Sequence, residues 1–309
     1  MSVVVPVYNG AATLGELTDR LLAVLRASGR PFEVILVDDG SRDGSAAEID
    51  RLAAAHAEVR GIQLMRNFGQ HNATLAGIRD ALHPVVVTLD DDLQHPPEAV
   101  PRLLEMLASG YDVVYASAIT PAHGLWRGLA TRITKLALSS AMGSDVARKV
   151  SPFRAFRSDL RNAFANYTGP QVSIDVLLSW ATTSFALVPF EHRARAIGRS
   201  NYTLGQLVRY ALTMMTGFST RPLRLASVIG FVFGLFGVGV LVEVVVRRLV
   251  SGNPVPGFPF IASIVSIFAG AQLFALGIIG EYLARMHFGM MDKPPYAIRR
   301  RIGEGGIDE

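Results

Sequence analysis

The chain has 309 residues, of which 50% are hydrophobic and only 18% are charged, and its mean hydropathy is +0.31. Globular proteins carry roughly 25% charged residues, so this composition excludes a disordered tail protein or a solvated coiled coil and argues against a purely soluble enzyme. The absence of cysteine excludes disulfide scaffolds, thiolate zinc clusters and cysteine nucleophiles. A net charge of +4 does not indicate nucleic-acid binding, and we expect no nucleic-acid partner.

The first third of the chain predicts an α/β fold. Short apolar segments rich in β-branched residues predict strands at 2–7, 34–37, 61–65, 85–89 and 113–116. Helical periodicity predicts helices between them, at 14–25, 45–56, 70–81 and 98–109. This alternation is typical of a mostly parallel sheet covered on both faces, in which ligands bind at the carboxyl ends of the strands.

A polar segment, Asp38-Asp39-Gly40-Ser41, follows the second predicted strand. It is compatible with an ordinary turn. The functional alternative is a nucleotide site, because a carboxylate only accepts hydrogen bonds and suits the N–H groups of a base or the hydroxyls of a ribose.

Three consecutive carboxylates, Asp90-Asp91-Asp92, follow the fourth predicted strand. Adjacent carboxylates repel one another, so their position at the end of an apolar strand indicates a bound cation. In an extended chain Asp90, Asp92 and Gln94 point to one side and Asp91 to the other, which predicts a Mg²⁺ site shared with substrate phosphates. The alternative is an acidic cap for the helix after Pro96-Pro97, although a cap needs one acid rather than three.

Positive charge is concentrated in the middle of the chain. Residues 1–119 hold 9 basic and 16 acidic residues, whereas residues 120–161 hold 8 and 2, and residues 191–224 hold 6 and 1. Nearly all the cations are arginines, which suit bidentate phosphate contacts. Apolar residues are interspersed with them, which predicts amphipathic juxtamembrane helices near 124–142 and 203–218. Core-facing helices of a soluble domain are the alternative.

Two long uncharged segments predict transmembrane helices at about 225–247 and 258–283. A helix crosses a bilayer with about 20 apolar residues, and core helices are rarely so apolar on every face. Basic residues precede the first span and follow the second, so the positive-inside rule places both flanks in the cytoplasm, although Arg247 and Arg248 count against it. The expected units are a cytoplasmic domain over 1–222, the spans over 223–285 and a basic cytoplasmic tail over 286–309.

Several motifs together resemble family 2 glycosyltransferases of GT-A fold. The matching segments, in this order, are Val3 to Asn9, Val37 to Ser41, Arg66 to His71 and Leu89 to Pro97. Later motifs extend the resemblance over nearly the whole chain: Arg195, Gly198, Ser200 and Tyr202, then Gly280-Glu281-Tyr282-Leu283. With two C-terminal spans, the chain resembles the polyprenyl-phosphate glycosyltransferases. That branch includes dolichyl-phosphate mannose synthases, bactoprenol glucosyltransferases and undecaprenyl-phosphate aminoarabinose transferases.

The resemblance implies a role for each matched residue. The implied nucleotide-binding residues are Pro6, Tyr8, Asn9, Asp38, Gly69, Gln70, Asp90 and Asp91. The implied ligands of Mg²⁺ or Mn²⁺ are Asp90, Asp92 and Gln94. Asp90, Asp92 and Arg195 are the implied catalytic residues, with Arg195 contacting the diphosphate from a loop. The implied lipid-phosphate ligands are Arg127, Arg132, Arg154 and Ser200.

The resemblance also implies a reaction. A metal-dependent, inverting glycosyltransferase in the bacterial inner membrane would move a sugar from a nucleotide sugar to undecaprenyl or decaprenyl phosphate, for modification of cell-envelope glycans. A phosphate monoester has a second pKa of about 6, so no general base is needed. The segment Arg66 to His71 favours a UDP-linked sugar, and GDP-mannose is the alternative donor. A small-residue pattern at Gly230 and Gly234 is a weak indication of a homo-oligomer, for which a tetramer is one arrangement.

Three positions depart from the family pattern, at Ala118, Arg148 and Asn201, where an arginine, an acid and a lysine are common. These departures concern the acceptor side and leave the nucleotide side intact. A processive polysaccharide synthase is an alternative function, but neither Trp126 nor Trp180 lies in the Gln-x-x-Arg-Trp segment that such synthases carry. A catalytically inactive nucleotide-sugar-binding subunit is another, and the complete acidic motif argues against it.

Overall fold

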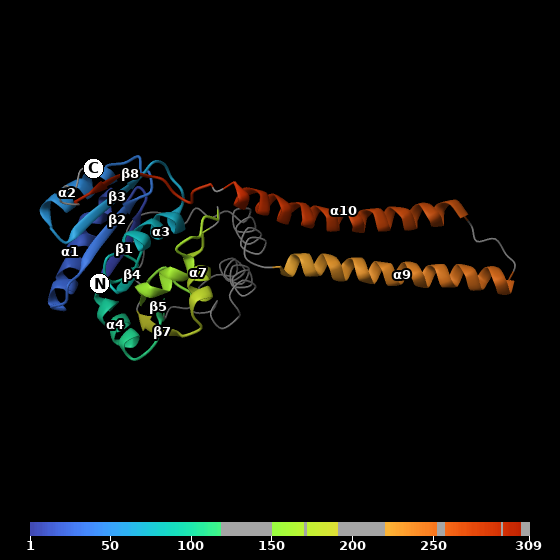
Figure 1. The fold of residues 1–309 in the computed structure, drawn as a ribbon, viewed down its shortest axis with the longest axis horizontal. Coiled ribbons are helices and arrows are strands. Elements are labelled where there is room, and N and C mark those ends of the chain that lie inside the picture. Colours follow the sequence, from blue (N-terminus) through green and yellow to red (C-terminus); the bar gives the residue numbers. More distant parts are fainter. Residues whose placement is uncertain (119–149, 170–171, 191–219, 252–256, 292, 304–309) are drawn as a thin grey trace.

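The computed structural model describes residues 1–118, 150–169, 172–190, 220–251, 257–291 and 293–303. These residues form an eight-stranded sheet with helices on both faces and a pair of long helices that extends away from it (Figure 1). The strand order is β7-β5-β6-β4-β1-β2-β3-β8. The predicted α/β fold, with a mostly parallel sheet and two apolar C-terminal helices, is confirmed.

The N-terminal half alternates strands and helices as the sequence predicts. The strands are β1 Ser2–Val7, β2 Glu33–Asp38, β3 Val59–Leu64 and β4 Val85–Thr88. The helices are α1 Ala11–Ala27, α2 Ser45–Ala55 and α3 Gln70–Asp80. Every residue of β1 and β2 is buried, as expected for central strands covered on both faces. Parallel pairing brings the carboxyl ends of these four strands to the same edge of the sheet.

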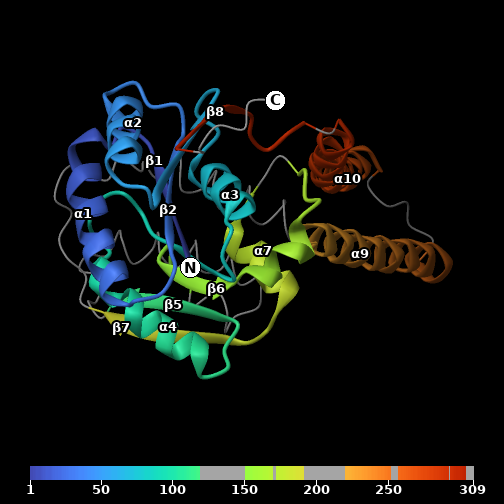
Figure 2. The same ribbon diagram turned by 60° about the vertical axis from the view of Figure 1, so that its left-hand side comes forward.

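Two apolar clusters hold the layers together, one on each face of the sheet. On one face α1 buries Leu14 and Leu17 completely, and on the other α3 packs against Val4 and Val37 (Figure 2). Gly77 makes the second contact possible, because a β-carbon there would lie 2.4 Å from Cγ1 of Val4. Glycine costs a helix about 1 kcal/mol relative to alanine, so close approach of α3 to the sheet explains its presence.

The other half of the sheet follows from the sequence only in part. The strand predicted at 113–116 is β5, Val113–Ala118, which follows a short helix η1, Pro97–Ala99, and α4, Val100–Ala108. The unpredicted strands are β6, Arg154–Arg157, antiparallel between β4 and β5, and β7, Phe185–Phe190, parallel to β5. Between β6 and β7 lie η2, Ser158–Phe164, and α7, Ile174–Ala181.

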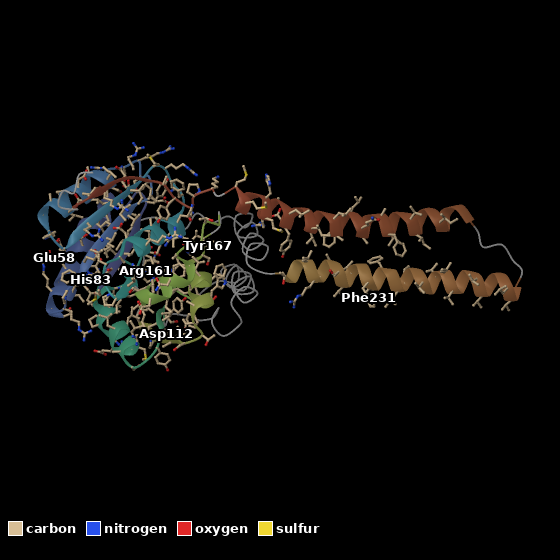
Figure 3. The ribbon with its side chains drawn as sticks, viewed as in Figure 1. Glu58, His83, Asp112, Arg161, Tyr167 and Phe231 are labelled. Carbon is tan, nitrogen blue, oxygen red and sulfur yellow. The ribbon has the colours of Figure 1, made fainter. Side chains whose placement is uncertain are left out.

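The two long helices are α9, Arg221–Ser251, and α10, Gly257–Met290, and they pack side by side. The rings of Phe233 and Phe268 lie 6.0 Å apart across this contact. The segments Leu223–Glu243 and Ile267–His287 are long and apolar enough to cross a membrane, and at most 6% of either is buried within the chain. Phe231 on α9 is 68% exposed (Figure 3). Buried core helices, the alternative to spans, would not present such a surface.

The C-terminal segment differs from the expected tail over 286–309. Helix α10 continues to Met290, and Ile298–Ile302 then forms β8, an edge strand antiparallel to β3. Arg300 donates hydrogen bonds to Asp50 Oδ2 at 2.7 Å and to Gln63 Oε1 at 2.9 Å. The run of arginines is therefore not simply a solvated cationic tail. Its partners lie about 240 residues earlier in the chain, where sequence pattern alone does not connect them.

Candidate active site

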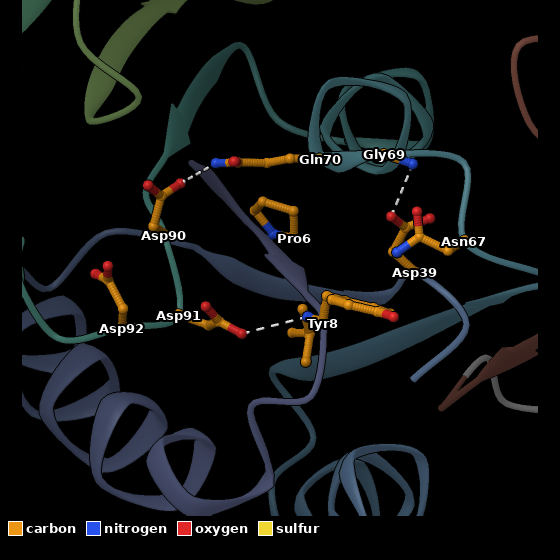
Figure 4. A pocket seen from close by; sticks show the side chains of 10 residues that line it. Pro6, Tyr8, Asp39, Asn67, Gly69, Gln70, Asp90, Asp91 and Asp92 are labelled. Carbon is orange, nitrogen blue, oxygen red and sulfur yellow. Dashed lines mark hydrogen bonds between the residues drawn. The ribbon is translucent and has the colours of Figure 1, made fainter. Parts of the chain in front are cut away.

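A pocket of about 200 Å³ opens where the carboxyl ends of the parallel strands meet (Figure 4). It is lined by Pro6, Val7, Tyr8, Asp39, Asn67, Gly69, Gln70, Asp90, Asp91 and Asp92. The tertiary structure therefore brings together segments that follow β1, β2, β3 and β4. This is the position that the rule for parallel sheets predicts for a ligand.

Asp39 organises one wall of the pocket. Its Oδ1 accepts a hydrogen bond from the backbone N–H of Phe68 at 2.7 Å, and its Oδ2 accepts one from Gly69 at 2.9 Å. Burial raises the pKa of this carboxyl, and the two amide donors offset part of that effect. Asp39 therefore fixes the loop directly before α3. Gly69 in this loop adopts a φ of +97°, a backbone conformation in which any other residue would be strained.

Asp38, which the resemblance assigned to the nucleotide, is not among the residues that line the pocket. It is the last residue of β2 and is 1% exposed, and its Oδ1 accepts the N–H of Ser41 at 3.0 Å. Its Oδ2 is buried without a hydrogen-bond partner in the part of the chain that is described. The strand extends one residue further than the predicted 34–37, so the next residue, Asp39, reaches the pocket.

Asn9 also lies outside the pocket lining. Its backbone N–H donates to Ser41 Oγ at 2.9 Å, and its side-chain Oδ1 accepts the N–H of Arg42 at 2.9 Å. Asn9 adopts a φ of +54°, a conformation that asparagine tolerates better than most residues. It ties the loop after β1 to the loop after β2 and thereby shapes the site indirectly.

The three consecutive carboxylates all line the same pocket. Gln70 Nε2 donates to Asp90 Oδ1 at 2.5 Å, and the N–H of Tyr8 donates to Asp91 Oδ2 at 3.4 Å. Asp91 is predicted to lie on the opposite side of the chain from Asp90 and Asp92. Strand β4 ends at Thr88 and a turn begins at Asp91, and all three side chains line the one pocket although Asp90 and Asp91 reach different partners. Leu93 then turns the chain with a φ of +59°.

Gln94, expected as a metal ligand, is not part of this lining. Its backbone N–H instead donates to Asp92 Oδ1 at 3.1 Å.

The electrostatics of the pocket fit a divalent cation. Four carboxylates line it, and a diphosphate entering this field would be repelled unless a cation neutralised part of the charge. Among the described residues no three carboxylate or imidazole groups converge as a complete metal centre. In many enzymes Mg²⁺ is held by one or two carboxylates together with substrate phosphates.

Arg154, expected to hold the lipid phosphate, is buried and does not line the pocket. It is 2% exposed, its Nη1 forms an ion pair with Asp175, and its Nε donates to Thr88 Oγ1 at 3.0 Å. Tyr115 donates a hydrogen bond to the same carboxylate at 3.1 Å. The only sequence signal for Asp175 was that it is a single acid within the apolar segment 172–178. Its pairing with Arg154 depends on the tertiary packing that brings α7 close to β6.

The remaining predicted ligands lie outside the described residues. They are Arg127, Arg132, Arg195 and Ser200, together with the amphipathic helices predicted at 124–142 and 203–218. Asn67 also lines the pocket, and sequence reasoning gave it no individual role; Asp39 belongs to the segment predicted as a nucleotide site, but within that segment the role was assigned to Asp38.

Comparison with known sequences decides the family. The profile described as "Glycosyl transferase family 2" matches residues 2–162, which contain the whole pocket. The chain belongs to glycosyl transferase family 2. As a family 2 glycosyltransferase it is an enzyme that transfers a sugar, and the predicted resemblance is confirmed.

Curated relatives align with this glycosyltransferase along nearly its full length. A protein of Pectobacterium carotovorum is 33% identical over 98% of this chain and 93% of its own. One of Pseudomonas paraeruginosa is 36% identical over 98% of this chain and 90% of its own. Both are named undecaprenyl-phosphate 4-deoxy-4-formamido-L-arabinose transferase. The alignment therefore includes the C-terminal helices as well as the family 2 domain.

A solved structure shares the fold of this family 2 domain. Glucosyl-3-phosphoglycerate synthase from Mycobacterium tuberculosis, in complex with Mn²⁺, uridine-diphosphate-glucose and phosphoglyceric acid, superposes with a TM-score of 0.52 at 22% identity. The match covers 70% of this chain and 78% of the synthase. At this identity the likeness establishes the GT-A fold alone.

Proposed function

We propose that this glycosyltransferase moves a sugar from a UDP-linked sugar to a polyprenyl phosphate at the cytoplasmic face of a bacterial inner membrane. The observation that carries the proposal is an acidic pocket at the strand ends in the same chain as a hairpin of two apolar helices. The names of the relatives support undecaprenyl phosphate as the acceptor. The segment Arg66 to His71 supports UDP over GDP.

The nucleotide would occupy the pocket of Figure 4. Tyr8 is 50% exposed at its mouth, so its ring is available to contact a base. The carboxylate oxygens of Asp39 retain lone pairs beyond those used by Phe68 and Gly69, and these would accept hydrogen bonds from the base or ribose. Helix α3 begins at Gln70 beside the pocket, where the positive end of its dipole favours an anion.

Asp90 and Asp92 would hold Mg²⁺ or Mn²⁺ together with oxygens of the diphosphate, with Gln94 as a third proposed ligand. When bound, the cation neutralises the negative charge that grows on the leaving diphosphate. The hydrogen bond from Gln70 to Asp90 orients that carboxylate before substrate arrives. Arg195 is proposed to contact the same diphosphate.

The reaction is a single displacement. An oxygen of the lipid phosphate bonds to the anomeric carbon while the bond from that carbon to the diphosphate breaks. The electron pair leaves with the nucleoside diphosphate, and the configuration at the carbon inverts. No proton moves, because a phosphate monoester with a second pKa of about 6 is already largely ionised at neutral pH. Arg127, Arg132 and Ser200 are proposed to hold the attacking phosphate, whereas burial of Arg154 in its ion pair argues against that role.

The hairpin supports a cytoplasmic active site. Chain continuity joins α10 to β8, which pairs with β3 in the catalytic sheet. Together with the start of α9 at Arg221, this puts both flanks on the side of the domain, and their positive charge favours the cytoplasm. Gly230 and Gly234 have open space where a β-carbon would lie, which leaves room for a second copy, and a homo-oligomer such as a tetramer stays a prediction.

The deciding experiment is transfer by the purified full-length protein in nanodiscs that contain undecaprenyl phosphate. Radiolabelled UDP-sugars and GDP-mannose are supplied in turn, with Mg²⁺, Mn²⁺ or EDTA. We expect a lipid-linked sugar from at least one UDP-sugar, and no product with EDTA. Product from GDP-mannose alone would overturn the donor assignment. Binding of nucleotide sugar with neither transfer nor hydrolysis would identify an inactive binding subunit.

A further inference from the structure

Arg285 is an incompletely paired cation at the base of the hairpin. It lies on α10, five residues before that helix ends at Met290. Its Nη2 donates to Glu281 Oε1 one turn earlier at 2.5 Å. Its Nε and Nη1 are both buried from solvent and have no hydrogen-bond partner in the described structure.

An ordinary ion pair on a helix surface would not leave two guanidinium nitrogens buried and without hydrogen-bond partners. In such a pair the unused N–H groups bond to water, and the interaction contributes little. Here the two remaining nitrogens are shielded from water, and buried donors on a charged group are costly unless an acceptor satisfies them. Glu281 reaches only Nη2 and is itself 52% exposed, so it does not supply that acceptor.

The position of Arg285 restricts the kind of acceptor. It lies within the last three residues of the apolar segment Ile267–His287, at the end nearest the sheet. The neighbouring Tyr282 hydroxyl makes a hydrogen bond with the backbone of Leu223, which ties this turn of α10 to the start of α9. Arg285 is therefore held at the expected boundary between hydrocarbon and cytoplasm. Because it still lies within the apolar segment, and ionisable residues within membrane segments commonly serve binding or transport, Arg285 is a candidate for a functional role.

We infer that Arg285 binds the phosphate of the polyprenyl acceptor through Nε and Nη1. This inference rests on the proposed function, and it extends the acceptor site from the catalytic domain onto the second membrane helix. A phosphate offers several acceptor oxygens and an ionic attraction, which meets the need of both donors. An anionic phospholipid headgroup presents the same chemistry at the same depth, and the experiment separates the two.

The test measures the KM for undecaprenyl phosphate in full-length enzyme in nanodiscs. Arg285→Gln should raise that KM by about 10- to 100-fold, the loss expected when a hydrogen bond to a charged group is removed. The Kd for UDP should not change, which shows that the variant is folded. In nanodiscs of phosphatidylcholine alone the effect should persist. Its disappearance there would mean that the anion is a phospholipid headgroup and would overturn the assignment to the acceptor.

Two matched variants separate ligand binding from simpler roles. Glu281→Gln removes the ion pair and leaves Arg285 in place, so the KM for lipid should stay the same or fall. A rise equal to that of Arg285→Gln would mean that the pair is only structural. Arg224→Gln removes a cation from the same end of the hairpin and should leave the KM unchanged. An equal rise would indicate general attraction rather than a site.

A binding measurement keeps the inference testable if the proposed function fails. Should the wild-type enzyme transfer no sugar to undecaprenyl phosphate, native mass spectrometry would compare retention of that lipid by wild type and Arg285→Gln. Weaker retention by the variant would support the site without the activity. Equal retention would overturn the inference, whereas an unchanged KM in an active enzyme would overturn it and leave the proposed function standing.

Discussion

Gly10 and Asp91 lie so close together that a β-carbon on Gly10 would be 2.3 Å from Asp91 Oδ2. Gly10 precedes α1 with a φ of −107°, which any residue adopts. The glycine is therefore required by the approach of the carboxylate and not by the backbone conformation. Asp91 also accepts the N–H of Tyr8, so the end of β1 and the acidic segment after β4 are joined at this point.

Gly10→Ala should displace Asp91 and distort the pocket while preserving the fold. We expect kcat/KM for the nucleotide sugar to fall about 10- to 100-fold, because small displacements of catalytic groups have effects of this size. Gly15→Ala, within α1, is the control, since its β-carbon would meet only the ends of two flexible side chains, Glu48 Oε1 at 3.4 Å and Arg51 Nη2 at 4.0 Å. Wild-type kinetics in Gly10→Ala would show that the position of Asp91 is unimportant.

Asp92→Asn should abolish transfer and leave the melting temperature near that of the wild type. The substitution keeps the shape of the side chain and removes a negative charge from the proposed metal site. We expect activity to fall by at least about 100-fold, with a higher Mg²⁺ concentration needed for any residual rate. Asp19→Asn, on an exposed position of α1, is the control. Full activity in Asp92→Asn would remove this residue from the site.

Arg154→Ala should unfold the domain more readily, because it leaves Asp175 as an uncompensated buried charge. The expected loss is about 3–5 kcal/mol in the free energy of unfolding. Arg157→Ala on the same strand is the matched control. Arg157 is half exposed and 3.6 Å from Asp112, so its loss should cost less than about 1 kcal/mol. Normal stability of Arg154→Ala with a raised KM for lipid phosphate would restore the original assignment of Arg154.

Removal of residues 296–309 should weaken binding of the nucleotide as well as the fold. Met65 donates its N–H to the carbonyl of Ala297 at 2.9 Å and accepts a hydrogen bond from Arg299 at 3.3 Å. Met65 directly precedes the loop that carries Asn67 and Gly69, so losing β8 frees one end of that loop. We expect the Kd for UDP, measured by calorimetry, to rise several-fold.

The control for that truncation removes residues 304–309 only, and it should bind UDP normally. Equal affinity in both shortened proteins would show that β8 serves the sheet edge without influencing the pocket.

Local pattern predicted the elements that carry their own signal. Apolar runs such as Val34 to Val37 gave strand positions, and their alternation with helices implied a parallel sheet. From this, the meeting of Pro6, Gln70 and Asp90 at one edge follows, because parallel strands end together. The two spans were equally clear, since length and the absence of charge suffice to identify them.

Contacts between distant segments decided the rest. Pairing of Arg154 with Asp175, and of Arg300 with Asp50, depends on packing that local periodicity does not encode, so cations that resembled ligands or a tail proved to have internal partners. The point at which β2 ends puts Asp39, and not Asp38, in the pocket lining. The turn after β4 brings Asp90, Asp91 and Asp92 to the same pocket. The sequence by itself determined the chemistry available at the strand ends. The tertiary structure decided which of those groups line the pocket, because one residue of strand length changes the side to which a side chain points.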